Sequence, residues 1–191
     1  MTARYIEIRS PADHLALSED LRRLDEWADT WQMIFKSSKC YMMSITNKRK
    51  PSLHTYKIKG GPLSTVTTHT YLGVDIDSKL TWTPHCNKVK KRATQTLGLV
   101  QRTLHAAPRA CKEMAYKTLV KPKLEYATTA WSPQTSGKIK QLESVQKKAA
   151  RFVTRQYSRE VRGDKIVQDL SWDTLETRRA AKSSIPLVRP S

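Results

Sequence analysis

Apolar residues at helical spacing predict a first helix near the N-terminus. Ser10-Pro11-Ala12-Asp13 is typical of a helix start, because Ser can cap the first turn, Pro suits the first helical position and Asp can complete a capping box. The apolar positions that follow are three or four residues apart, which predicts one stripe on a helix of about five turns. They are Leu17, Leu21, Leu24, Ala28, Trp31 and Phe35.

Shorter runs with the character of strands follow this helix. Cys40–Ile45 is predicted as a strand. His54–Lys59 and Pro62–Val66 are predicted as a hairpin, because Gly60-Gly61 between them is typical of a tight turn.

The stretch Thr68–Trp82 is predicted as a central strand that ends in a turn. Leu72, Val74 and Ile76 occupy every second position, so on a strand they share one face. Residues 1–83 therefore predict a helix packed on a small antiparallel sheet.

The chain after Thr83-Pro84 has the pattern of a helical region. Further helices are predicted after Ala107-Pro108, after Ser136 and from Ser171. Tyr126 and Trp131 are expected in the core between two prolines. Other residues that mark these elements are Val89, Ala93, Leu97, Val100, Leu104, Met114, Ala115, Thr118, Leu119, Ile139, Leu142, Val145, Ala149 and Phe152. The predicted fold class is α+β, with domains at residues 1–83 and 84–191, and the tail 184–191 is expected to be disordered.

Net charge separates this chain from an ordinary soluble domain. Its 191 residues carry +18, and residues 84–160 alone contain 17 basic and four acidic side chains. A basic excess in one helical region indicates a polyanionic partner, most often nucleic acid, with an anionic membrane surface as the alternative. The three scattered cysteines, the absence of an apolar signal core and the absence of a long apolar run predict an intracellular protein, nuclear or cytoplasmic, that does not cross a membrane.

Two helix faces are candidates for contacts with nucleic-acid phosphates. An ordinary solvated face mixes charges of both signs, but here acidic residues are scarce, which favours phosphate binding. The candidates are Lys88, Lys91, Arg92, Lys140, Lys147, Lys148, Arg151 and Arg155.

No catalytic or metal-binding motif stands out. Asp75 and Asp77, two apart on a strand, could bind a divalent cation, but a polar strand end is the favoured interpretation because no third acidic residue is near. The histidines and cysteines lack the short spacing of structural zinc sites. No metal site and no small-molecule site is therefore predicted.

The residues in chain order resemble the reverse transcriptase of non-LTR retrotransposons, the LINE-type and especially the jockey-like elements. The similarity runs from about Ile8 to about Lys182. Its pieces are Asp20-Leu21-x-x-Leu24-x-x-Trp27, Trp31, Lys39-Cys40, Tyr71-Leu72-Gly73-Val74, Leu80-Thr81-Trp82, His85, Ala115-Tyr116, Leu119–Pro122, Leu124–Ala127, Trp131–Pro133, Glu143–Arg151, Leu170–Trp172, Leu175 and Arg178-Arg179.

This resemblance implies a position within a polymerase. The first part resembles the end of the palm, and Tyr71-Leu72-Gly73-Val74 resembles the primer grip, which holds the 3′ end of the growing DNA strand. The helices after Pro84 resemble the thumb and its continuation. Lys39 falls where such polymerases place a lysine near the leaving pyrophosphate, and an ordinary loop lysine is the alternative.

The resemblance also implies what the chain lacks. The family's Tyr/Phe-x-Asp-Asp signature lies upstream of the segment that corresponds to Arg4–Arg9, so the chain is expected to begin after it. Phosphoryl transfer needs carboxylates that bind metal ions. Mg²⁺ is therefore expected only in the intact polymerase, and this chain alone is expected to be inactive.

Several functions remain open from the sequence. The first is a fragment of an RNA-directed DNA polymerase that binds an RNA–DNA duplex, or an RNA template with its DNA primer, without a membrane or a small-molecule substrate. The alternatives are a stand-alone basic protein that binds nucleic acid or an acidic partner, an enzyme that works through Asp75 and Asp77, and a polypeptide with no selected function.

Overall fold

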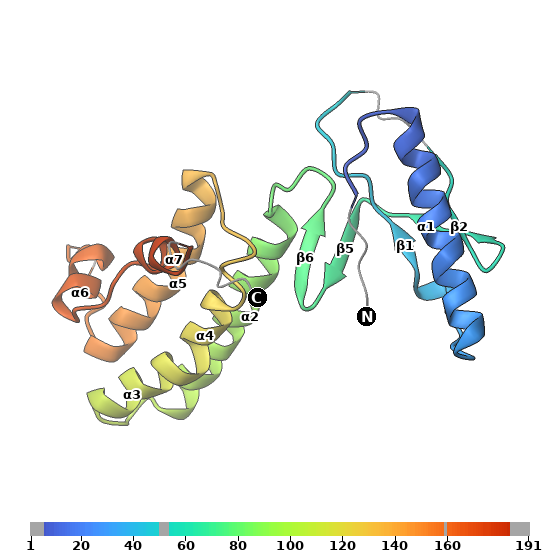
Figure 1. Ribbon diagram of the computed structural model, residues 1–191. Helices are drawn as coiled ribbons and strands as arrows, with labels where there is room; N and C mark the ends of the chain where they lie inside the picture. Colours follow the sequence, from blue (N-terminus) through green and yellow to red (C-terminus); the bar gives the residue numbers. More distant parts are fainter. Residues whose placement is uncertain (1–5, 50–53, 159, 184–191) are drawn as a thin grey trace. The chain divides into compact units, whose positions relative to one another are not determined.

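The computed structural model describes residues 6–49, 54–158 and 160–183, and the predicted disorder of 184–191 lies outside them (Figure 1). The chain forms two compact units. One takes the chain up to His69 together with Asp77–Leu80, and the other takes Thr70–Ile76 and the chain from Thr81 onward. The polymerase domains predicted at residues 1–83 and 84–191 stay predictions.

The first unit is built on helix α1, Pro11–Thr30. It starts as predicted, because Asp13 Oδ2 accepts a hydrogen bond from the backbone N of Ser10 at 2.6 Å. Its apolar stripe is only thinly covered. Ala28 is buried, whereas Trp31 is 67% exposed and the leucines of the stripe are half-buried.

Short strands complete the first unit. After the 3₁₀ turn η1 (Ser37–Lys39), β1 (Tyr41–Met42) pairs in parallel with β4 (Ser64–Thr65). β2 (Lys57–Ile58) pairs antiparallel with β3 (Gly61–Pro62) and packs on α1.

The prediction of one antiparallel sheet is therefore wrong. The strands form separate two-stranded pairs, and the long connection between β1 and β4 lets those two run in the same direction. The predicted hairpin is present, but Lys59 and Gly60 form its turn, with φ of 49° and 72°.

The stretch predicted as one central strand is a hairpin. β5 (Thr68–Tyr71) pairs with β6 (Val74–Asp77), and only two residues connect them. These are Leu72 with φ 46° and Gly73 with φ 82°, the left-handed pair that a tight hairpin turn requires. Leu72 is consequently 66% exposed while Val74 is buried, so the predicted shared face is wrong.

The second unit consists of residues 70–76 of this hairpin and the helices that follow it. They are α2 (Thr83–Thr103), α3 (Arg109–Ala115), the π-helical turn η2 (Tyr116–Val120), α4 (Lys121–Glu125), α5 (Ser136–Thr154), α6 (Gly163–Asp169) and α7 (Leu175–Ser183). Mixed helices and small sheets agree with the α+β class in its coarse form.

The predicted stripes of α2 and α5 form the centre of the second core. Val89, Ala93, Leu97 and Val100 of α2 are buried, and Leu104 packs against them. The buried residues of α5 include Leu142, Val145, Ala149 and Phe152. Trp131 is buried as predicted, but Tyr126 is 56% exposed and does not belong to the core.

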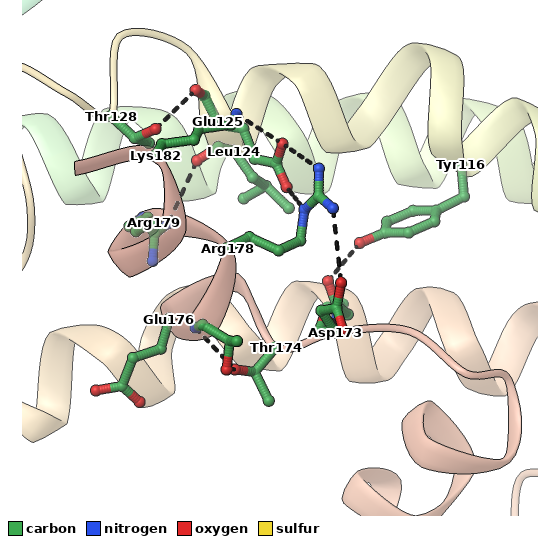
Figure 2. Close-up of polar contacts among 12 residues, drawn as sticks. Tyr116, Leu124, Glu125, Thr128, Asp173, Thr174, Glu176, Arg178, Arg179 and Lys182 are labelled. Carbon is green, nitrogen blue, oxygen red and sulfur yellow. Dashed lines mark hydrogen bonds and ion pairs between the residues drawn. The ribbon is translucent and has the colours of Figure 1, made fainter. Parts of the chain in front are cut away.

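The last helix, α7, is held to α4 by charge. The Glu125 carboxylate accepts hydrogen bonds from Arg178 and from Lys182, the latter at 3.0 Å (Figure 2). Nearby, the Tyr116 hydroxyl donates to Gln146 Oε1 at 2.8 Å. The Glu125 carboxylate therefore stabilises the packing of α7 on the second unit.

Candidate nucleic-acid interface

The tip of the β5–β6 hairpin presents a short turn to solvent. Tyr71 is half-buried at its base, Leu72 and Gly73 are exposed, and Val74 anchors the turn in the core. Tyr126 lies against the turn, because its hydroxyl donates to the Leu72 carbonyl at 3.0 Å and its ring would lie 3.5 Å from a Cβ at Gly73. The sequence motif predicted as a primer grip therefore contains a hairpin turn that Tyr126 stabilises.

A polar network joins the hairpin to α2. The Asp75 carboxylate accepts from Thr70 Oγ1 and pairs with Lys88, and the Asp75 backbone N donates to His85 Nδ1 at 3.1 Å. Burial by itself would raise the pKa of Asp75, but the bonds and charge of Lys88 and the Thr70 bond outweigh it and lower this pKa.

His85 completes this network as a neutral ring. Because its Nδ1 accepts a hydrogen bond, its proton resides on Nε2, which is buried against Trp131 with the ring centroids 4.4 Å apart. Burial lowers the pKa of His85 and outweighs the opposing charge of Asp75, while the charges of Lys88 and Arg92 lower it further. The network stabilises the hairpin, and Lys88 contributes to it through its ion pair with Asp75.

Helices α2 and α5 pack on each other and run in the same direction. Gln141 near the start of α5 donates to Asn87 Oδ1 near the start of α2 at 3.0 Å. At the other end, Arg155 Nη2 donates to the His105 carbonyl at 3.4 Å. The starts of the two helices therefore lie next to each other, and so do their ends.

Where α2 and α5 pack together, each helix has a line of residues seven apart at the edge that faces solvent. We call the two lines together the α2–α5 seam. Seven residues are close to two helical turns, so such residues share a side, and the line covers about 21 Å of α2. It consists of Asn87, Thr94 and Gln101 on α2, of Gln141 and Lys148 on α5, and of Arg155, the residue that follows α5.

A depression lies at each end of the seam. The first has a volume of about 320 Å³ and is lined by Asn87, Lys90, Lys91, Thr94, Gln95 and Gln141. The second has a volume of about 270 Å³ and is lined by Gln101, His105, Lys112, Phe152, Arg155 and Tyr157. Neither lining contains a carboxylate.

The structure separates the predicted cations into exposed and engaged ones. Lys91, Arg92, Lys140 and Lys148 are exposed, and none has an ion-pair partner among the described residues. Arg155 is exposed at the end of the seam.

The engaged cations have structural partners. Lys147 pairs with Asp164 of α6. Arg151 donates to the carbonyls of Ser158 at 2.9 Å and Val161 at 2.7 Å and so fixes the chain after α5. Lys147 and Arg151 lie together with Lys140 on one side of α5, about 60–100° from Lys148.

Sequence reasoning missed two cations that line the depressions. Lys90 was passed over because it lies beside the predicted triplet on α2, and Lys112 because its short helix has no run of basic residues. A step of seven residues from Asn87 or Gln141 would have pointed to the seam, but no local signal identifies Lys112. Lys39, in the first unit, is an exposed residue of η1.

Three of the four acidic residues between 84 and 160 have partners on other elements or within α3 and η2. Glu113 binds Lys117 and the Trp172 indole, Glu125 binds α7, and Glu143 accepts from the backbone N of Glu176. The exposed cations of the seam are therefore not neutralised by neighbouring carboxylates in the described part of the chain.

The described residues do not fit a divalent metal ion. Asp75 is already paired with Lys88, and no group of three or more His, Cys, Asp or Glu residues in residues 6–49, 54–158 and 160–183 could hold a metal. None of the helices in those ranges has the length and hydropathy needed to span a membrane.

Comparisons with known proteins point to mobile elements. The chain is 26% identical over 155 residues to the probable RNA-directed DNA polymerase from transposon X-element of Drosophila melanogaster. It is 23% identical over 143 residues to the RNA-directed DNA polymerase from mobile element jockey of the same species, and 26% identical over 142 residues to the jockey polymerase of Drosophila funebris.

These matches cover much of this chain and little of the relatives. They span 78%, 72% and 73% of this chain but only 17%, 15% and 15% of the respective relatives. No protein-family profile matches the chain. No solved structure matches it.

Proposed function

We propose that this chain is the duplex-binding segment of a mobile-element RNA-directed DNA polymerase. In this role the α2–α5 seam contacts the sugar–phosphate backbone of an RNA–DNA duplex, and the hairpin tip at Leu72 and Gly73 contacts the 3′ end of the primer. The chain order of the pieces that resemble non-LTR reverse transcriptases supports this role, as do the three polymerase relatives.

The observation that carries the proposal is the set of unneutralised cations along one side of the second unit. Lys90 and Lys91 of α2 line the depression at one end of the seam and Lys148 of α5 lies on it, in a stretch with few acidic residues, while Arg92 is exposed on another side of α2. Such cations displace counterions from a nucleic-acid backbone, which gives affinity without base recognition. We therefore expect binding that follows duplex shape rather than sequence.

Two roles complete the proposal. Lys39 would lie near the leaving pyrophosphate in the whole polymerase, as the resemblance implies. Mg²⁺ chemistry would belong to carboxylates other than Asp75, because Asp75 is paired with Lys88.

A salt titration tests the proposal. Anisotropy of a labelled RNA–DNA duplex is measured between about 50 and about 200 mM salt, where several phosphate contacts give a steep fall in affinity. Replacing Lys90, Lys91, Arg92 and Lys148 with Gln should reduce the slope of log affinity against log salt by about three to four.

The control removes the same charge elsewhere in the unit. Arg109, Lys117, Lys123 and Lys165 are exposed cations on α3, η2, α4 and α6. Replacing these four with Gln should leave most of the slope in place. Equal slopes for the two variants would refute the seam as the contact surface, and no salt-dependent binding by the wild type would refute the function.

A further inference from the structure

Lys112 is a buried cation without a counterion. The residue is only 1% exposed, and its Nζ lies 4.9 Å from the centroid of the Phe152 ring. Within the described residues its ammonium has a ring contact with Phe152 and no hydrogen bond or ion pair. The contact with the ring is therefore its one described electrostatic compensation.

The depression at the end of the seam collects further donors around this lysine. Arg155 shares the lining, and its guanidinium has five N–H donors, of which one bonds the His105 carbonyl at 3.4 Å. The amide of Gln101 and the hydroxyl of Tyr157 also line the depression. Three separate segments thus supply donors to one volume of about 270 Å³.

The physical consequence is a site prepared for an anion. A charged ammonium without a counterion is unfavourable when its side chain is withdrawn from solvent, and the Lys112 side chain is almost wholly buried. Burial lowers the pKa of Lys112, and the charge of Arg155 lowers it further. An anion that enters the depression regains the lost interaction and meets no carboxylate in the lining.

The donor set favours a phosphate group. Lysine and arginine have only donors, and phosphate oxygens are acceptors that accept several charge-assisted bonds at once. The volume is below the usual range of about 300–1,000 Å³ for small-molecule sites, which suits one group rather than a whole ligand.

We propose that the depression at the end of the seam binds one phosphate group, with Lys112 and Arg155 as its charged ligands and with Gln101 and Tyr157 as further donors. The site itself depends only on these residues. The source of the phosphate, a strand of nucleic acid lying along the seam, rests on the function proposed above.

The first test uses inorganic phosphate as the probe. Its titration, followed by NMR at constant ionic strength, should shift the amide signals near Lys112, Phe152 and Arg155. Lys112→Met keeps the length of the side chain and should weaken phosphate binding at least tenfold. The control is Lys117→Met, a neighbouring exposed lysine paired with Glu113, which should leave binding unchanged.

A second variant keeps the test decisive if Lys112→Met fails to fold. Arg155 is exposed after the end of α5, so Arg155→Gln should fold and should also weaken phosphate binding about tenfold. Phosphate affinity that is unchanged in the folded variants, or shifts at Lys91 instead of Lys112, would overturn the site.

Oligonucleotides then identify the source of the phosphate. Strands with and without a 5′-phosphate are compared, and a loss confined to the 5′-phosphorylated strand in Lys112→Met indicates a terminal phosphate, while an equal loss for both indicates the backbone. Phosphate binding without duplex binding would keep the site and refute the proposed function. Duplex binding together with phosphate binding that Lys112→Met leaves unchanged would refute the site and keep the proposed function.

Discussion

The hydroxyl of Tyr126 donates to the backbone carbonyl of Leu72 at 3.0 Å, across 54 residues of chain. This bond holds the segment after α4 against the turn of the β5–β6 hairpin. The turn itself depends on left-handed backbone at Leu72 and Gly73. The turn is therefore exposed and at the same time held by a side chain from a distant part of the chain.

Gly73→Ala should destabilise the second unit by about 1–2 kcal/mol, because an L side chain at its φ of 82° is strained. The added Cβ would be in ordinary contact with Tyr126, so the strain is in the backbone. Urea unfolding measures the effect. Gly137→Ala, in the first turn of α5 with open space around it, is the control and should not destabilise. Equal losses in both variants would contradict the role of the turn.

Arg151→Gln should destabilise the second unit by about 2 kcal/mol, because it removes hydrogen bonds from a charged donor to carbonyls beyond α5. Lys148→Gln, one turn earlier and exposed, should change stability by less than about 0.5 kcal/mol. Thermal unfolding measures stability, and duplex binding in a salt titration should show the opposite ranking. A destabilised Lys148→Gln would refute this division of roles.

Glu125→Gln should remove about 3 kcal/mol of stability at neutral pH, because it breaks the partly buried pairing with Arg178 and Lys182. Burial alone would raise the pKa of Glu125, but bonds and charge from Arg178 and Lys182 outweigh it and lower this pKa below 4.5. A lowered folded pKa means that the stabilisation is complete above 4.5 and is lost as pH falls through the folded value.

Denaturant unfolding at several pH values checks the sign of this effect. The gap in stability between wild type and Glu125→Gln should be widest near neutrality and should narrow below about pH 4. Glu160→Gln, at an exposed position, is the control and should follow the wild type. A gap that widens in acid would show that the pKa is raised instead.

Tyr116→Phe should cost about 1–3 kcal/mol, since it leaves the buried Oε1 of Gln146 without its donor. Gln146 also donates to the Asp173 carbonyl at 2.8 Å, so the loss loosens the segment before α7. Hydrogen exchange of α7 should therefore accelerate together with the fall in unfolding free energy. If the variant is destabilised but the hydrogen exchange of α7 is unchanged, the lost bond does not loosen the segment before α7.

Helical periodicity was sufficient for the buried faces of α2 and α5, whereas the stripe predicted for the first helix ran to Phe35, beyond the end of α1 at Thr30. The stripes of α2 and α5 could be read because each residue of a helix keeps a fixed angle to its neighbours, so apolar positions three and four apart lie on one side. The cap at Ser10 is equally local, since it needs only Asp13.

The position of a turn and the pairing of distant segments were beyond the reach of the sequence pattern. Alternation at Leu72, Val74 and Ile76 is the same for one long strand as for a strand end beside a turn, and only the left-handed backbone at Leu72 and Gly73 separates the two. The parallel pairing of β1 with β4 likewise depends on how the chain returns.

The amino-acid sequence determined the helices, the basic excess between residues 84 and 160 and the similarity to mobile-element polymerases, because these depend on composition and on neighbours along the chain. Only the tertiary structure decided which cations are engaged. Lys88, Lys147 and Arg151 have partners, whereas Lys148 is exposed and Lys112 is buried without a counterion. The reason is that a charge is neutralised or left open by groups close in space, and those groups lie far away in sequence.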